Sequence, residues 1–322
     1  MSFPQQNGAG STWLLTDGHA GNLRQAEALA RALGHNPLVP ALAPTAPWRW
    51  FAPRVLPGAG RAFGPDFSRW ANAVPPPALA IGCGRQGALA TRLLRARGAH
   101  AVQILDPRVD TRGWDLVIAP EHDRLRGANV LPVLGSLNPV DDAWLAEAAI
   151  AFGNLPALPA PRVALLVGAP TRQAAWDLRE FTMMAGKLKA QLQACGGSLL
   201  ATVSRRTPEP LRRALGELMH DLPGLFWDGA GANPYPGLLA CADRLVCTAD
   251  SVNMLSEACA TTAPVYTFGA RHARGRVGNY LDALSRRGRV RPFDGDLAPF
   301  AVEPIRETAR IAAQVRQRLA LP

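Results

Sequence analysis

One pattern recurs along most of this 322-residue chain and restricts the folds open to it. A short apolar or β-branched run is followed by a turn of glycine or polar residues, and then by a stretch with apolar residues at helical spacing. This alternation is the signature of βα units, in which parallel strands form a sheet and helices cover its faces. The chain is therefore predicted to be an α/β protein.

A proline-rich stretch near the middle of the chain, residues 154–161, separates two halves that each show the pattern; it contains Pro156, Pro159 and Pro161. Such a stretch is typical of a linker, and the length of the chain is about twice that of an average domain. We therefore expect two doubly wound, Rossmann-like domains that face a central cleft, over residues 1–155 and 156–322. The final run, 304–319, has helical spacing and is predicted to be a terminal helix that crosses back to the first domain.

The individual elements follow from the same pattern. In the first half the predicted strands are 11–16, 77–82, 100–105, 115–119 and 129–133, and the predicted helices are 22–33 and 86–97. In the second half the predicted strands are 162–168, 198–204, 225–227, 244–248 and 263–268, and the predicted helices are 173–195, 208–220, 236–242 and 252–260. The proline-rich stretch 37–77 receives no assignment.

Composition narrows the functional classes. No run approaches the roughly 18 apolar residues of a membrane-spanning helix, and the first ten residues do not resemble a signal peptide. The five cysteines form no metal-ligand pattern, so we expect reduced thiols in a cytoplasmic protein that needs no metal.

The net charge is +10, and all basic residues except Lys187 and Lys189 are arginine. This composition favours phosphate or an anionic membrane surface as a partner, although a GC-rich coding sequence also produces it. Because basic and aromatic residues are not interleaved, nucleic acid is not expected.

The most informative stretch is 244–258, where a predicted strand enters a helix through Thr248-Ala249-Asp250-Ser251. The open amides and positive dipole end of such a helix suit a phosphate, and the Ser251 hydroxyl would add a donor. Glu257 lies about two turns further on, where its carboxylate would bind sugar hydroxyls. The alternative is that Asp250 or Ser251 only caps the helix and Glu257 is a surface residue.

Two further loops fall at predicted strand ends in the second half. Ser204-Arg205-Arg206 follows one strand, and a pair of arginines there would clamp a diphosphate if the carboxyl ends of the strands line the ligand site. An exposed basic turn explains the same residues. The loop from Gly168 to Thr171 closes the preceding strand and would contribute backbone donors to the same edge.

The first half offers acid–base residues at strand ends. Asp17 and His19 follow the first strand, and His122 and Asp123 follow the strand 115–119, so each set is a candidate for general-base catalysis. Residues 82–87 also read G-x-G-x-x-G, with Asp106 about 20 residues further on, as in a nicotinamide-binding fingerprint. Because the motif is not in the first βα unit, a tight strand–helix turn is the preferred explanation.

Taken together, the motifs of this chain resemble those of the "elongated mitochondria" or mitochondrial-fission family, which looks like part of the glycosyltransferase-B superfamily. They occur in order along the chain, at 17–21, 82–85, 103–108, 120–123, 204–208, 233–235 and 248–258. The last motif is also similar to the T-D-S-G-G-x-x-E-E-A stretch of UDP-N-acetylglucosamine 2-epimerases.

The resemblance implies roles for several residues. Ser251 and the backbone of Val252 and Asn253 would hold a nucleotide diphosphate, with Glu257 on the ribose, and Asn233 and Tyr235 would join the donor site. In this chain Val252 and Asn253 stand in place of the two glycines of the epimerase motif. Their side chains leave less room for a phosphate to approach the backbone. Plant members of the family are associated with recruiting division machinery to mitochondria, whereas bacterial members have no settled reaction.

Three functions follow as alternatives. The first is a metal-independent glycosyltransferase that takes a nucleotide-diphosphate sugar, most simply a UDP-sugar, and transfers the sugar to an unknown acceptor. In this alternative Asp17 or His19 activates the acceptor, and the protein docks peripherally on the inner face of an anionic membrane. The second is a non-catalytic adaptor or binding protein that retains the fold. The third is an NAD-dependent sugar-nucleotide enzyme.

Overall fold

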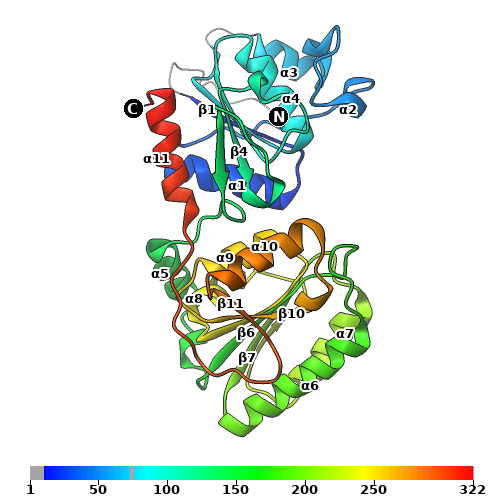
Figure 1. The fold of residues 1–322 in the computed structure, drawn as a ribbon, viewed down its shortest axis with the longest axis vertical. Coiled ribbons are helices and arrows are strands. Elements are labelled where there is room, and N and C mark those ends of the chain that lie inside the picture. The colour runs from blue at the N-terminus through cyan, green and yellow to red at the C-terminus, as the bar shows by residue number, and fades with distance from the viewer. Residues whose placement is uncertain (1–10, 73–75, 322) are drawn as a thin grey trace. The chain divides into compact units, whose positions relative to one another are not determined.

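The computed structural model describes residues 11–72 and 76–321, and the chain divides into two compact units. Unit 1 is Met1–Pro139 together with Glu307–Pro322, and unit 2 is Val140–Arg306. Each unit contains one parallel sheet with helices packed on it (Figure 1). The start of the chain, from which a signal peptide was judged absent, lies outside the described residues.

The sheet of unit 1 contains five parallel strands in sequential order. They are β1 (Thr12–Thr16), β2 (Leu79–Cys83), β3 (His100–Ile104), β4 (Leu116–Pro120) and β5 (Val130–Val133). Leu38 extends the sheet on the free side of β1, because its amide donates to the Thr12 carbonyl and its carbonyl accepts from the Leu14 amide, both at 2.8 Å. The chain thus leaves β1 toward one side and returns to β2 on the other. The carboxyl ends of β1 and β2 therefore form the topological switch point of this sheet.

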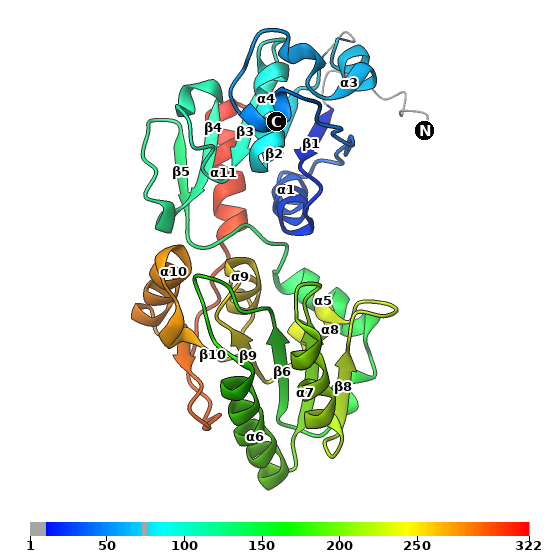
Figure 2. The ribbon, with the colours of Figure 1, turned by 90° about the vertical axis from the view of Figure 1, so that its right-hand side faces the viewer.

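Helices cover both faces of this sheet (Figure 2). Leu14 of β1 packs with α1 (Ala20–Ala32) and α11 (Glu307–Leu319), whereas its neighbours Trp13 and Leu15 pack with α3 (Gly64–Ala71) and α4 (Gly84–Arg95). Successive residues of a strand point to opposite faces, so a sheet covered on both sides requires the nearly continuous apolar runs seen in the sequence. The short helix α2 (Trp48–Phe51) lies in the segment between Leu38 and α3.

The sheet of unit 2 contains six parallel strands in the order β11-β10-β9-β6-β7-β8. Their bounds are β6 (Arg162–Val167), β7 (Ser198–Val203), β8 (Gly224–Trp227), β9 (Arg244–Thr248), β10 (Val265–Phe268) and β11 (Val290–Pro292). This is the Rossmann strand order, in which the chain reverses direction across the sheet between its first and fourth strands. The switch point of unit 2 therefore lies at the carboxyl ends of β6 and β9.

Two helices of unit 2 share one apolar core on a face of the sheet, and the other helices pack elsewhere. α6 (Leu178–Cys195) and α7 (Glu209–Met219) pack on one face of the sheet and form its large apolar core with Trp176 and Phe268. α8 (Tyr235–Cys241) contacts β6 and β7 and packs on α5 (Asp142–Ala151). α9 (Val252–Cys259) follows β9, and α10 (Gly275–Arg286) precedes β11.

The division of the chain differs from the predicted boundary at residue 155. The proline-rich stretch lies inside unit 2, where Leu155 is buried, and the chain enters that unit already between Pro139 and Val140. The reason is that α5, which precedes the prolines, packs on α8 of unit 2. The terminal helix does cross back to unit 1, as predicted, where it contacts α1 and β5.

Two predicted helix starts also shift. The helix expected from residue 173 begins at Leu178, because Asp177 and Glu180 form a capping box in which the Glu180 amide donates to the Asp177 carboxylate at 2.8 Å. The terminal helix begins at Glu307 rather than 304. Among the described residues, no helix is both long enough and apolar enough to cross a bilayer.

An ion pair joins the amino ends of β6 and β9. Arg162 Nε and Nη2 donate to the two oxygens of Asp243 at 3.0 and 2.9 Å, and the Arg162 amide donates to the same carboxylate at 2.7 Å. Burial raises the pKa of the Asp243 carboxyl, but these hydrogen bonds outweigh it and the net pKa is lowered. The pair therefore fixes the two strands whose opposite ends form the switch point.

We expect Asp243→Asn to lower the free energy of unfolding by about 1 kcal/mol at pH 7, since the ion pair is partly exposed. Because the pKa is lowered in the fold, the carboxylate stabilises the protein above its ordinary pKa, and this contribution disappears as pH falls through the lowered value. The two proteins should thus converge in denaturant titrations below about pH 4. Asp282→Asn, at an exposed position, is the control; an equal loss there would contradict the assignment.

Candidate functional site

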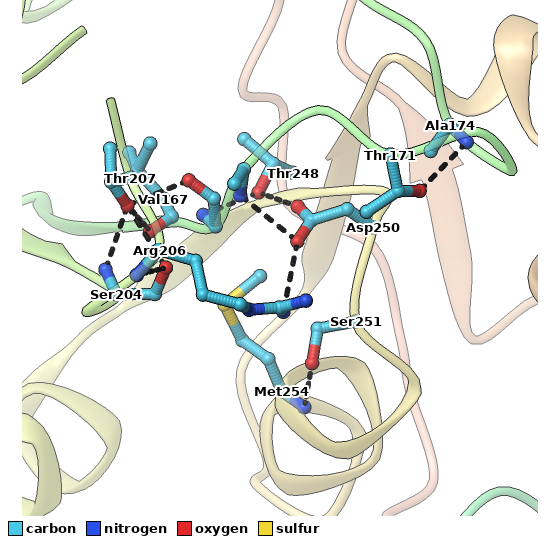
Figure 3. Close-up of polar contacts among 12 residues, drawn as sticks. Val167, Thr171, Ala174, Ser204, Arg206, Thr207, Thr248, Asp250, Ser251 and Met254 are labelled. Atoms are coloured by element: carbon cyan, nitrogen blue, oxygen red, sulfur yellow. Dashed lines mark hydrogen bonds and ion pairs between the residues drawn. The ribbon is translucent and has the colours of Figure 1, made fainter.

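A cluster of polar groups occupies the switch point of unit 2 (Figure 3). The Thr248 hydroxyl accepts a hydrogen bond from the Gly168 amide at 2.8 Å and donates to Asp250 Oδ1 at 2.6 Å. The other carboxylate oxygen of Asp250 accepts from the Ala169 amide at 3.1 Å. These bonds join the loop after β6 to the loop after β9.

The close approach of these loops requires a glycine at position 168. A Cβ atom built there would lie 2.1 Å from Asp250 Oδ2, well inside contact distance. Gly168 was expected to contribute a backbone donor to this edge; in the structure its amide donates to Thr248, and its lack of a side chain leaves space for Asp250.

The loop after β7 is attached to the same place. Thr207 Oγ1 lies 2.7 Å from the Gly168 carbonyl and accepts from the Ser204 amide at 2.9 Å, so the turn from Ser204 to Thr207 is folded onto the end of β6. Arg212, on α7, reinforces the turn by donating to the carbonyls of Thr207 and Ser204, each at 3.0 Å. Sequence reasoning missed Arg212, because nothing in its spacing distinguishes it from other helical arginines.

The two predicted arginines behave differently. Arg206 Nη2 lies 3.8 Å from Asp250 Oδ2, and 63% of its side chain is exposed, whereas the Asp250 side chain is fully buried. Arg205 is exposed and makes no ion pair or hydrogen bond with the described residues. The expected pair is therefore a single oriented cation and an exposed neighbour.

Asp250 orients Arg206 and is itself held in an unfavourable environment. Burial raises the pKa of its carboxyl, while the hydrogen bonds from Thr248 and Ala169 and the charge of Arg206 act in the opposite direction. A buried acid of this kind is already saturated with donors from the protein. Asp250 therefore positions the loops and the arginine, rather than presenting an open acceptor.

The amino end of α9 lies beside this arginine. Ser251 is the N-cap, and its hydroxyl accepts a hydrogen bond from the Met254 amide at 3.4 Å, so Ser251 does cap the helix. The amides of Val252 and Asn253 are first-turn groups without an acceptor inside their own helix. In Figure 3 the Arg206 guanidinium extends over Ser251 at the start of α9. A cation and a helix amino end thus converge on one spot.

Glu257 lies further along α9 and is 4% exposed, which is inconsistent with the surface alternative. Its Oε2 accepts a hydrogen bond from the hydroxyl of Tyr235, at 2.6 Å, and Tyr235 begins α8. The structure therefore brings together two of the residues that the resemblance placed in the donor site. Asn233 is exposed and accepts from the Tyr235 amide at 3.0 Å, so it shapes the start of α8.

Thr171 has a local role as well. Its hydroxyl accepts from the amides of Gln173 and Ala174, at 3.2 and 3.1 Å, and closes a turn in the loop after β6.

In unit 1 the first predicted catalytic set lies at the switch point of its sheet. Asp17 Oδ1 accepts from the Asn22 side-chain amide at 2.8 Å and from the His19 amide at 3.3 Å, and His19 is the exposed N-cap of α1. Gly84, at the end of β2, approaches Asp17 so closely that a Cβ atom would lie 2.6 Å from its carboxylate. The carboxylate is therefore fixed between β1 and β2.

The second set, His122 and Asp123, lies at the carboxyl end of β4. Burial lowers the pKa of His122 and raises that of Asp123, although each partly offsets the shift of the other. Because β2 and β3 separate β4 from β1, the two catalytic sets are about 14 Å apart along the sheet edge. The two predicted sets therefore share one edge of the sheet but are not neighbours on it.

The G-x-G-x-x-G stretch serves close packing. A Cβ on Gly87 would lie 2.0 Å from the Leu15 carbonyl oxygen, and one on Gly82 would lie 2.7 Å from Gln103 Oε1. Asp106 accepts from the Arg108 amide at 2.8 Å and pairs with the Arg108 side chain. The glycines are therefore explained by strand–helix contact, as the preferred sequence interpretation stated.

Solved structures show the same fold. UDP-GlcNAc 2-epimerase from Methanocaldococcus jannaschii superposes with a TM-score of 0.58 at 13% identity, over 96% of this chain and 99% of that one. The epimerase from Neisseria meningitidis, bound to UDP-GlcNAc, gives 0.53 at 11% identity over 96% and 100%. The prediction of two Rossmann-like domains of the glycosyltransferase-B type is thus confirmed.

Sequence comparison identifies relatives directly. The mitochondrial fission protein ELM1 of Arabidopsis thaliana is 32% identical over 275 residues, which are 76% of this chain and 64% of the plant protein. An uncharacterized protein of Rickettsia prowazekii is 21% identical over 284 residues, 75% of this chain and 79% of that protein. The model of the family described as "Mitochondrial fission ELM1" matches residues 20–319. The chain therefore belongs to the Mitochondrial fission ELM1 family.

Proposed function

We propose that this chain binds a nucleotide-diphosphate sugar, of the UDP type, at the switch point of unit 2 and transfers the sugar to an acceptor. The observation that carries the proposal is Arg206, held by the buried Asp250 beside the amino end of α9. A guanidinium and two helix amides that point to one place form a site for a diphosphate. In the transfer step the sugar–phosphate bond breaks, the acceptor oxygen bonds to the sugar, and these groups stabilise the departing diphosphate without requiring a metal.

Glu257 gives the site a second feature, a buried carboxylate that accepts a hydrogen bond from the phenol of Tyr235. Vicinal ribose hydroxyls donate well to a carboxylate, and the bond from Tyr235 fixes the orientation of that carboxylate. We therefore assign the ribose to Glu257 and Tyr235. Ser251 and the backbone of Val252 and Asn253 would hold the diphosphate.

The acceptor hydroxyl needs a base, and the edge of the sheet in unit 1 supplies candidates. Asp17 and His19 lie at the switch point of that sheet, where α/β proteins bind their ligands. His122 is a second candidate, because burial lowers its pKa and keeps the imidazole neutral near pH 7, in the form that accepts a proton.

The structural comparisons support this proposal at the level of the fold. Two of the epimerase structures with this fold contain UDP-GlcNAc, one from Methanocaldococcus jannaschii and one from Neisseria meningitidis. Fold alone does not fix function, so the argument rests on the local arrangement of Arg206, α9 and Glu257.

The adjacent arginines provide a matched test. We expect UDP to bind the wild-type chain, and Arg206→Gln to weaken this binding about 10- to 100-fold because one charge-assisted contact to phosphate is lost. Arg205→Gln should leave the affinity nearly unchanged. Isothermal titration calorimetry with UDP, GDP, CDP, TDP and NAD measures this directly. If no nucleotide binds, or if both variants lose affinity equally, the proposed donor site is wrong.

Glu257→Gln tests the proposed contact with the ribose separately from the contacts with the diphosphate. The amide retains an oxygen that accepts from Tyr235 but no longer carries the charge that binds the ribose hydroxyls, so UDP should bind about tenfold more weakly. Inorganic diphosphate, which has no ribose, should bind both proteins equally. A parallel loss of both ligands would show that Glu257 acts through the structure of α9 instead.

A non-catalytic binding protein is the alternative, and one observation favours it. Val252 and Asn253 stand where the similar epimerase motif has glycines, and they place side chains at the amino end of α9. Release of UDP from UDP-sugars, followed with and without candidate lipid and peptide acceptors, distinguishes the two functions. Binding of UDP without any turnover would support the binding protein, and turnover abolished by Asp17→Asn would support the transferase.

A further inference from the structure

The segment 39–61 of unit 1, here called the aromatic segment, exposes an unusual number of apolar side chains. Val39 is 51% exposed, Trp50 61%, Phe51 47% and Val55 47%. Among the described residues, only three other large apolar side chains are similarly exposed, at 43–82%, and all three lie in unit 2. The exposed apolar surface of unit 1 is therefore concentrated around α2.

This exposure is built into the fold. Ala52, between Phe51 and Pro53, is buried in the core that includes Phe63. The Arg49 carbonyl accepts hydrogen bonds from the side chains of Arg85 and Gln86, at 3.1 and 2.9 Å. The Pro53 carbonyl accepts from Arg92 Nη1 at 2.8 Å. Contacts on both sides of Trp50 and Phe51 thus fix the backbone while these two side chains remain outside.

The charged residues within the aromatic segment are all basic. Arg49, Arg54 and Arg61 are exposed, and the sequence contains no aspartate or glutamate between Glu27 and Asp66. The Arg49 guanidinium lies over the Trp50 ring, 5.3 Å from its centroid. Tryptophan and arginine together are the side chains that favour the boundary between lipid headgroups and acyl chains.

We propose that the aromatic segment docks on an anionic lipid bilayer, with Trp50, Phe51 and Val55 in the interface and the arginines on lipid phosphates. The proposal is independent of the nucleotide site. A bilayer fits because the apolar groups protrude from a fixed backbone and because the segment itself carries three arginines and no acidic residue. Arg85 is in the first turn of α4, directly after β2, so docking also brings the carboxyl edge of this sheet toward the lipid.

Vesicle flotation of the full chain tests the proposal. Vesicles of phosphatidylcholine alone are compared with vesicles that contain 30 mol% phosphatidylglycerol, which we choose as the anionic lipid, in about 0.1 M salt. We expect the wild-type chain to float with the anionic vesicles only. The variant W50S/F51S should partition at least tenfold less, since it loses the apolar contacts, and R54Q/R61Q should lose about fivefold for each arginine removed.

Matched controls use equally exposed residues elsewhere. Ile150→Ser removes a side chain that is 82% exposed in unit 2, and R126Q/R286Q removes two exposed arginines outside the aromatic segment. Both should float like the wild type, and all variants should retain its melting temperature and its affinity for UDP. Flotation with neither vesicle, equal flotation of W50S/F51S and wild type, or an equal loss in the controls would each overturn the proposal.

Discussion

The buried carboxylate of Asp250 is the group on which the candidate site depends. It accepts hydrogen bonds from a backbone amide in the loop after β6 and from the Thr248 hydroxyl at the end of β9. It also forms an ion pair with Arg206, in the loop after β7. These three loops meet only because the strand order reverses between β6 and β9, which leaves space above the sheet. Part of the cost of burying this acid is offset by the hydrogen bonds from Thr248 and Ala169 and by the charge of Arg206.

Sequence reasoning recovered the elements that local patterns determine. The strand 244–248 and the helix from residue 252 match β9 and α9, because a β-branched run and an N-capping serine are local signals. The domain boundary was misplaced because prolines indicate a turn but do not show which core the residues before the turn join. Here the packing of α5 on α8 places these residues in unit 2. α10 and β11 were not predicted at all. Their apolar residues are few, and Arg289, which lies between them, looks like a surface residue in the sequence although it is buried against the carbonyls of Ala258 and Cys259 in α9.

The same limit applies to the site. The sequence places Arg205 and Arg206 after a strand, but only tertiary contacts show that Arg206 pairs with the buried Asp250 whereas Arg205 does not. The same holds for Glu257. Its spacing along α9 predicts which side of the helix it lies on, but it does not show that the side chain is buried or that Tyr235, from another helix, is its partner. In unit 1, the sequence grouped His122 with Asp17 as strand-end residues, and the strand order separates them by two intervening strands. Spacing identifies an edge, and topology decides which residues on it are neighbours.

In both sheets the switch point lies at the carboxyl ends of two adjacent strands, but the functional groups placed there carry opposite charges. Unit 2 places a cation and helix amides there, supported by a buried acid, which suits an anion that must be held. Unit 1 places a carboxylate there, fixed by Asn22 and approached by Gly84, which suits the binding or deprotonation of a hydroxyl. A glycosyl transfer needs both kinds of group, one for the departing diphosphate and one for the incoming oxygen. The two units therefore differ in the charge that each places at the switch point of its sheet.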